Sequence, residues 1–180
     1  EIARYSMSAE GRLLDVSALP SVTVKIRRTP PPRIDGNLDD ECWRESASFT
    51  GFVLEDGGPA RSQSVGLIAS DGMNLYLGMV LNDGRGAGLE RVAFLIGPPG
   101  EPVRRIEINS RGSVKAGGKA RIKAAALALA AKGAWSLEAS VPLADISKKG
   151  IQDGSDWRLN VVRHRAGRAG EGRSAWSGTP

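Results

Sequence analysis

Four acidic residues surround a Gly-Asn turn in the segment PRIDGNLDDECW, residues 32–43. Carboxylates at this density have three uses: ligands for a hard cation such as Ca2+, a pair for acid-base chemistry, or the start of a helix, where free N–H groups attract negative charge. As calcium ligands the candidates are Asp35, Asp39 and Asp40, although the segment lacks the regular alternation of acids seen in EF-hand loops. We interpret it as a turn that leads into a short helix with Cys42 and Trp43 buried.

A second candidate metal group consists of Asn82, Asp83 and Glu90, which carry the oxygen atoms that Ca2+ prefers. This group also lacks the alternating acids of an EF-hand loop, so solvated turn carboxylates are the competing interpretation. Cys42 is the only cysteine, which excludes an internal disulfide and a thiolate metal site of the usual kind.

The sequence predicts no catalytic residue. His164 is the only histidine and stands between Arg163 and Arg165, where neighbouring positive charge disfavours its protonation. We therefore interpret His164 as a strand or surface residue rather than the base of a Ser-His-Asp triad. No spacing of acids in a turn identifies the pair of carboxylates that glycoside hydrolysis requires.

The charge of the chain is moderately basic, with 25 Lys and Arg against 20 Asp and Glu and a formal net charge of +5. The basic residues are spread along the sequence, and no nucleic-acid-binding motif accompanies them, so we expect no nucleic-acid partner. No apolar run approaches the roughly 18 residues of a membrane span, so we expect none.

Turn residues divide the chain into short segments, since it contains 23 glycines and 10 prolines. Several segments alternate apolar and polar residues as half-buried strands do. Asp71-Gly72 between two such segments predicts a β-hairpin, because glycine accepts the positive φ that tight turns need. Strands are expected at residues 22–26, 62–69, 74–81, 91–96, 103–109, 113–115, 123–130, 134–141 and 157–163.

This spacing is typical of an all-β fold, an antiparallel β-sandwich of the jelly-roll or immunoglobulin-like kind with one or two short helical turns. Residues 124–131 are rich in alanine and have helical propensity, but the link to the strand that follows favours a hairpin. Residues 142–146 are expected to form a single helical turn. We expect residues 1–20 to be an arm or the end of a preceding domain, and residues 21–180 to be one sandwich domain.

Seven segments in this order resemble the family 9 carbohydrate-binding modules and the extracellular β-sandwich domains related to them. They are RIDGNLDD (33–40) with Trp43, NLYLG (74–78) with Asn82 and Asp83, ERVAFL (90–95), IEINSRG (106–112), WSLEASVP (135–142), WRLN (157–160) and SAWS (174–177). The resemblance implies a non-catalytic module of a secreted, multidomain bacterial protein that acts on polysaccharides, for example attached to a glycoside hydrolase. It also implies structural calcium, and an extracellular, cell-surface or periplasmic location.

Family members hold a sugar between two tryptophans, but the resemblance does not carry this clamp over. The first tryptophan would lie in residues 84–89, which contain no aromatic residue. An acid of the family is replaced by Ala93, and a basic group of the next strand falls near Glu107. The second clamp tryptophan is expected beyond Trp176 in the sequence. Trp176 itself corresponds to an earlier tryptophan of the same family segment, which has a structural role.

Our first hypothesis is therefore an oligosaccharide- or polysaccharide-binding module. Its arginines lie in the region where family members have the aromatic rings that hold the sugar. Its candidate ligand-binding residues are Trp176, Arg85, Arg105, Asn109 and Arg173, and the cationic character favours acidic glycans. The alternative is a sandwich that has lost sugar binding and serves as a scaffold or contact surface for other domains of the same chain. An exposed Trp176 beside a groove would favour the first hypothesis, and a buried Trp176 the second.

Overall fold

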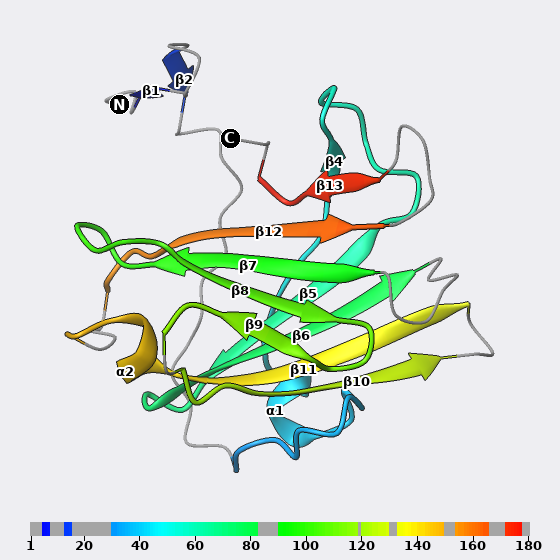
Figure 1. Ribbon diagram of the computed structural model, residues 1–180, viewed down its shortest axis with the longest axis vertical. Coiled ribbons are helices and arrows are strands. Elements are labelled where there is room, and N and C mark those ends of the chain that lie inside the picture. The colour runs from blue at the N-terminus through cyan, green and yellow to red at the C-terminus, as the bar shows by residue number, and fades with distance from the viewer. Residues whose placement is uncertain are drawn as a thin grey trace.

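The structure is a computed structural model, and it describes residues 5–7, 13–15, 30–82, 90–118, 120–129, 133–149, 154–165 and 172–177. Two antiparallel sheets lie face to face and are accompanied by two short helices (Figure 1). The prediction of an all-β sandwich with one or two helical turns is confirmed. No helix among the described residues is both long and apolar enough to cross a membrane.

One sheet has six strands in the order β4-β13-β12-β7-β8-β9. Its central strands β12 and β7 pair along their whole length, from Arg158 opposite Gly97 to His164 opposite Arg91. The strands are β4 (Val53–Leu54), β7 (Arg91–Gly97), β8 (Arg104–Asn109), β9 (Val114–Ala116), β12 (Arg158–His164) and β13 (Arg173–Ala175).

The other sheet has five strands in the order β10-β11-β6-β5-β3. They are β3 (Ala47–Phe49), β5 (Ser64–Ser70), β6 (Asn74–Asn82), β10 (Lys123–Leu129) and β11 (Ala134–Pro142). The predicted hairpin is confirmed, because β5 and β6 pair and Gly72 between them has a φ of 86°. The alanine-rich segment is also a strand, since β10 pairs with β11.

Several predictions of the sequence need correction or remain open. The short strands β3, β4 and β13 were not predicted, because two or three residues show no detectable period. In the expected arm, β1 (Tyr5–Met7) and β2 (Leu13–Asp15) pair with each other in a separate two-stranded sheet. The strand expected at residues 22–26 lies outside the described residues, and the domain boundary at residue 20 stays a prediction.

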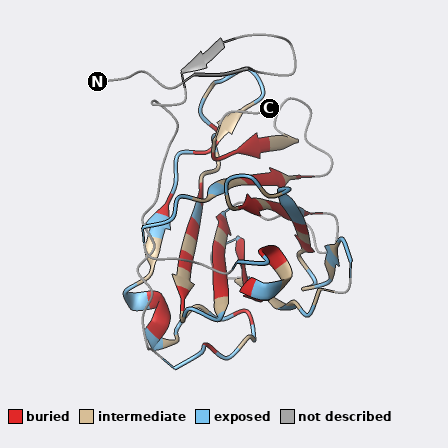
Figure 2. Ribbon diagram, turned by 90° about the vertical axis from the view of Figure 1, so that its left-hand side faces the viewer, coloured by how far each residue is buried: buried red, intermediate tan, exposed pale blue. Residues whose placement is uncertain are grey.

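The core lies between the two sheets and consists of the inward half of each alternating strand. In β11, Trp135, Leu137, Ala139 and Val141 point inward and are at most 5% exposed. Figure 2 shows that buried residues dominate the central strands, whereas the connections are largely exposed. Trp135 is thus a core residue, and Trp157 is partly buried against the same core.

The segment at residues 32–43 covers the outer face of the five-stranded sheet and leads into α1 (Glu41–Arg44). Cys42 and Trp43 are buried there as predicted, together with Tyr76. Their cluster lies outside the sheet rather than between the sheets. The acids serve the turn, since Asp35 accepts a hydrogen bond from the Asn37 N–H at 2.9 Å.

Two turns confine the backbone of β10. A Cβ atom on Gly36, which has a φ of +90°, would lie 2.9 Å from the carbonyl carbon of Ala126. A Cβ atom on Gly112 would lie 3.1 Å from the Cα of Ala125. Backbones this close leave little room for side chains, which explains why β10 consists mainly of alanine.

A second helical turn, α2 (Leu143–Ile146), follows β11 directly and confirms the turn expected at residues 142–146. Leu143 and Ile146 are both 3% exposed and join the core, so this turn closes one side of the sandwich.

Candidate functional site

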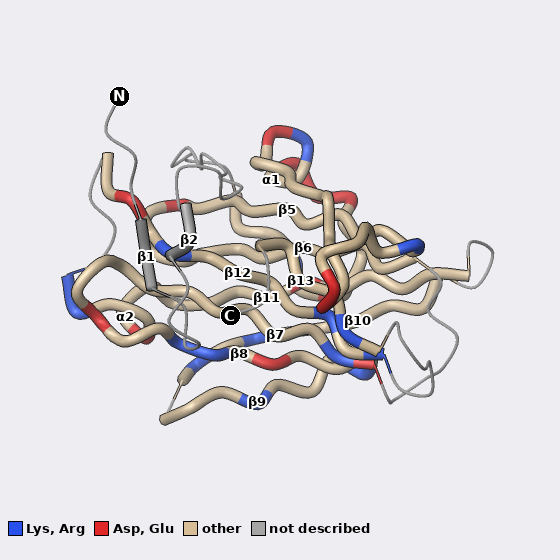
Figure 3. Tube along the Cα trace, turned by 90° about the horizontal axis from the view of Figure 1, so that it is seen from above, with Lys and Arg blue, Asp and Glu red and all other residues tan. Residues whose placement is uncertain are grey.

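The outer face of the six-stranded sheet carries four of the polar residues that the sequence singles out: Arg105, Asn109, His164 and Arg173. In β7, Val92 and Phe94 point into the core, so Arg91, Ala93 and Leu95 lie on the outer face. The same alternation places one half of each neighbouring strand on this face. In Figure 3, basic and acidic segments lie side by side on β8 and β9.

Register places three cationic or titratable side chains in one row across this face. His164 of β12 lies opposite Arg91 of β7 on one side and opposite Arg173 of β13 on the other. Asn109, at the end of β8, lies opposite Arg91 and extends the row. We call Arg91, His164 and Arg173 the basic row.

The next row is apolar at its centre and charged at one end. Ala93, Val162 and Ala175 are neighbours across three strands and are all 0% exposed. Beyond Ala93 the row continues with Glu107 of β8 and Lys115 of β9. Small side chains therefore separate the basic row from Leu95 and Asn160 in the row beyond.

Glu107 is the acid nearest the centre of this group. Its carboxylate pairs with the Nε atoms of Arg105, at 2.7 Å, and Arg91, at 3.4 Å. The hydrogen bond from Arg105 chiefly, with the charges of Arg105 and Arg91, lowers the pKa of Glu107 despite its partial burial. Glu107 is thus a carboxylate shared between two arginines.

Arg173, at the far end of the basic row, has a weaker partner. Its Nη1 lies 3.3 Å from Oε1 of Glu55, whose side chain is 65% exposed. Exposed pairs of this kind contribute little, because water and salt screen them. The arginines and Lys115 outnumber the two acids, so this face keeps an excess of positive charge.

The surroundings of His164 disfavour its protonated form. Burial lowers its pKa, and the positive charges of Arg91, Arg173 and Arg105 lower it further, against the opposing effect of Glu107. Its Nε2 atom is buried and has no hydrogen-bond partner among the described residues. The direction agrees with the expectation from sequence, but the cause differs, because Arg163 and Arg165 are buried and the cations of neighbouring strands act instead.

The candidate ligand-binding residues fall into three groups. Arg105, Asn109 and Arg173 share the outer face, although the Oδ1 atom of Asn109 accepts the N–H groups of Arg111 and Ser113 in its own turn. Arg85 lies outside the described residues. Arg91 and His164 were not among the candidates, and only the register of three strands shows that they join Arg173.

Trp176 is a core residue in the structure. It is 5% exposed, its ring centroid lies 4.6 Å from that of Phe49, and its Nε1 donates to the carbonyl of Thr50 at 3.1 Å. A ring buried to this extent has no free face for a sugar. This burial favours the scaffold alternative as far as this ring is concerned.

The predicted calcium group is built around an arginine instead. The Nη2 atom of Arg163 donates to the carbonyl of Asn82 at 2.8 Å and to Oε2 of Glu90 at 3.0 Å. Oε2 of Glu90 also accepts the indole N–H of Trp135 at 2.8 Å. Asn82 and Glu90 therefore do not fit a Ca2+ ion, because the guanidinium supplies the positive charge that a metal would bring. Asp83 lies outside the described residues.

The first acidic segment does not fit a metal either. The carboxylates of Asp35 and Asp40 accept backbone N–H groups of the turn, and Asp39 accepts the side-chain amide of Asn37. Asp40 precedes the first residue of α1, yet its side chain bonds to the N–H of Arg33 rather than to a helix N–H. No three acidic, histidine or cysteine side chains converge among the described residues.

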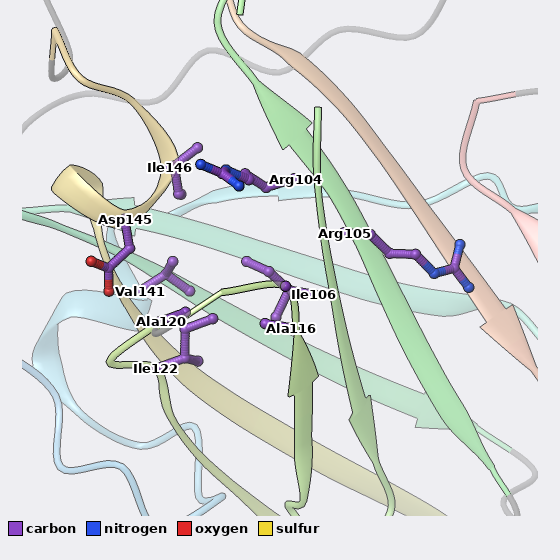
Figure 4. Close-up of a pocket in the computed structure, with 10 residues that line it drawn as sticks. Arg104, Arg105, Ile106, Ala116, Ala120, Ile122, Val141, Asp145 and Ile146 are labelled. Carbon is purple, nitrogen blue, oxygen red and sulfur yellow. The ribbon is translucent and has the colours of Figure 1, made fainter. Parts of the chain in front are cut away.

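A pocket opens between β8, the connection to β10 and α2 (Figure 4). Ile106, Ile122, Val141 and Ile146 line it, so it is mainly an opening into the core. It has room for about one water molecule, which is too little for a sugar ring. Arg105 points away from this pocket, which agrees with its place on the outer face (Figure 4).

Fold and face together define the class of protein: an antiparallel two-sheet sandwich with a polar, basic outer sheet face. Solved structures with this fold include a family 9 carbohydrate-binding module from Caldicellulosiruptor kristjanssonii in complex with glucose. It matches with a TM-score of 0.62 and 11% identity over 86% of this chain and 85% of that chain. A structure of a family 9 module from the same organism with cellotriose matches with a TM-score of 0.60 and 13% identity, over 82% and 80% of the two chains.

A third structure, of a candidate carbohydrate-binding protein from Bacteroides uniformis, has a TM-score of 0.52 and 14% identity, over 73% of this chain and 77% of that chain. No protein-family model matches the sequence, and no curated protein matches it. The shared fold confirms the resemblance seen in the sequence at the level of architecture. The resemblance leads us to expect an acidic side chain at Ala93 and a basic side chain near Glu107. These two residues are direct cross-strand neighbours.

Proposed function

We propose that this protein is a non-catalytic carbohydrate-binding module and that its ligand lies on the outer face of the six-stranded sheet. The observation that carries the proposal is the convergence of Arg91, Arg105 and Arg173 on this face, in a fold shared with modules solved with glucose and cellotriose. Guanidinium groups suit such a ligand, because each presents several N–H donors to hydroxyl or carboxylate oxygens.

The ligand class that this charge favours is an acidic glycan, such as an oligosaccharide of uronic acids. A hydrogen bond between an arginine and a carboxylate is roughly twice as strong as one between neutral groups. Neutral glucans would lack that gain, and they would meet no exposed ring at Trp176 on which to stack.

The proposal extends to the setting of the module. We place it in a secreted bacterial protein, extracellular, at the cell surface or in the periplasm, beside other domains that act on polysaccharides, such as a glycoside hydrolase. The resemblance seen in the sequence motivates this setting, whereas the names of the solved structures with this fold support carbohydrate binding alone. Calcium has no assigned part in binding, because Arg163 takes the oxygens of Asn82 and Glu90.

Calorimetric titration with trigalacturonate and with cellotriose tests the proposal. We expect trigalacturonate to bind, and the variant Arg91→Ala to weaken its affinity at least tenfold. Arg44→Ala is the matched control, because Arg44 lies on α1, on the outer face of the opposite sheet. Failure of both sugars to bind at millimolar concentration would refute the function.

A second candidate is a scaffold or contact module that has kept the sandwich without sugar binding. The burial of Trp176 supports it, because no indole is left exposed at that end. Under this alternative neither sugar binds, and the other domains of the same chain bind to the folded module in a pull-down experiment.

A further inference from the structure

We propose that the acidic group of the ligand binds over His164, between Arg91 and Arg173, and that His164 takes up a proton from solvent as the ligand binds. The inference rests on the proposed carbohydrate-binding function and specifies its ligand: a sugar whose carboxylate lies on the basic row.

The geometry of the row suits a single anionic group. Arg91, His164 and Arg173 are Cα partners on three adjacent strands, so neighbouring backbones are separated by about 4.8 Å. The two arginines are therefore about 10 Å apart across His164. Both arginine side chains are long enough to reach toward His164 from either side. The two oxygens of a carboxylate can then accept one hydrogen bond from each arginine.

The present partners of the two arginines leave room for this anion. Arg91 shares Glu107 with Arg105 at the longer distance, 3.4 Å against 2.7 Å. Arg173 pairs at 3.3 Å with Glu55, which is largely exposed. A ligand carboxylate can replace Glu55 at small cost, because Glu55 then returns to water.

His164 supplies the last donor once it is protonated. Its Nε2 atom has no hydrogen-bond partner among the described residues, so a proton there has no competing acceptor among them. In the free protein, burial and the cations lower the pKa of His164. The charged groups facing it from the surrounding strands are Arg91 on β7, Arg105 and Glu107 on β8 and Arg173 on β13, with Lys115 on β9 and Glu55 beyond β4 further out.

A bound carboxylate would change this balance, because an opposite charge in contact favours the imidazolium. The pKa of His164 must then rise on binding. By linkage, affinity must strengthen as pH falls through the range between the free and bound pKa values. Each unit by which the pKa rises corresponds to about a tenfold gain in affinity at low pH.

The experiment follows the imidazole of His164 by NMR as a function of pH, because the chain contains one histidine and gives one signal. It is run on the free protein, with trigalacturonate and with cellotriose. We expect the pKa to rise with trigalacturonate only. His164→Asn should keep binding but lose the pH dependence, Arg173→Ala should weaken binding and reduce the shift, and Arg44→Ala should change neither.

The possible results separate this inference from the function beneath it. Binding of trigalacturonate with an unchanged pKa of His164 would overturn the inference and leave the carbohydrate-binding function standing. Binding of cellotriose without binding of trigalacturonate would also overturn the inference and leave the carbohydrate-binding function standing. If neither sugar binds at millimolar concentration, both proposals fail.

Discussion

Glu138 and Trp43 are 95 positions apart in the sequence, yet Oε1 of Glu138 lies 2.7 Å from the indole nitrogen of Trp43. The other carboxylate oxygen accepts the backbone N–H groups of Asp35 and Gly36 at 3.0 and 2.9 Å. One fully buried carboxylate therefore fastens both the turn and the first helix of the acidic segment to β11.

Glu138→Gln should destabilise the protein by about 1–3 kcal/mol, because the new amide can accept from the turn but then faces the Trp43 N–H with a donor of its own. Trp43→Phe removes that donor, so the double variant should cost less than the sum of the two single variants. Urea denaturation of all four proteins measures this coupling. Strictly additive costs would contradict the hydrogen-bond assignment.

The stability difference between the wild type and Glu138→Gln should also depend on pH. Burial raises the pKa of Glu138, even though the hydrogen bonds from Trp43, Asp35 and Gly36 act in the opposite direction. A raised folded-state pKa stabilises the fold at pH values below the unfolded pKa of about 4.3, and this contribution is lost as pH rises through the folded pKa. The unfolding free energy of the wild type minus that of Glu138→Gln should therefore decrease as pH rises from 4. A difference that grows with pH would show the opposite sign of shift.

Gly36→Ala should be more destabilising than Gly51→Ala. Both glycines have nearly the same left-handed φ, 90° and 92°, so both variants carry a similar backbone cost of about 1–2 kcal/mol. Only at position 36 would the new Cβ meet the backbone of β10, at 2.9 Å, whereas nothing lies within 4 Å at position 51. Equal melting temperatures for the two variants would exclude this contact.

Arg163 and Glu90 should show strong coupling in a double-mutant cycle. Arg163 is 0% exposed, and loss of either member of the pair leaves the other charge buried without this partner, at a cost of about 3–5 kcal/mol. Arg163→Met with Glu90→Gln removes both charges and keeps an acceptor for Trp135, so the double variant should cost much less than the sum. Guanidinium denaturation measures the cycle, and additivity would mean that the ion pair is not formed.

The thiol of Cys42 should stay unreactive in the folded protein. Burial chiefly, with the negative charges of Asp40 and Glu138, raises the pKa of Cys42 to about 11, so the thiolate is scarce at neutral pH. Ellman's reagent at pH 8 should react only as fast as the segment opens, and at once in denaturant. Rapid reaction of the native protein would show that the cluster of Cys42, Trp43 and Tyr76 is open.

Much of the fold follows from local chemistry that a sequence displays directly. The alternation of apolar residues predicts most of the longer strands, and Asp71-Gly72 predicts the β5–β6 hairpin, because glycine alone adopts positive φ at no steric cost. The order of the motifs also leads to the fold that the solved structures share.

The site could not be predicted in the same way. Arg91, His164 and Arg173 belong to three strands, and a row exists only once register has aligned them. Trp176 is buried because Phe49 of the other sheet packs against it, and Asn82 and Glu90 surround Arg163 rather than a metal. By itself the sequence determined most of the longer strands, the β5–β6 hairpin and the sandwich class of the fold, because those depend mainly on neighbours along the chain. Which polar groups meet across the sheets was decided by the tertiary structure, because pairing register and packing depend on residues far apart in sequence.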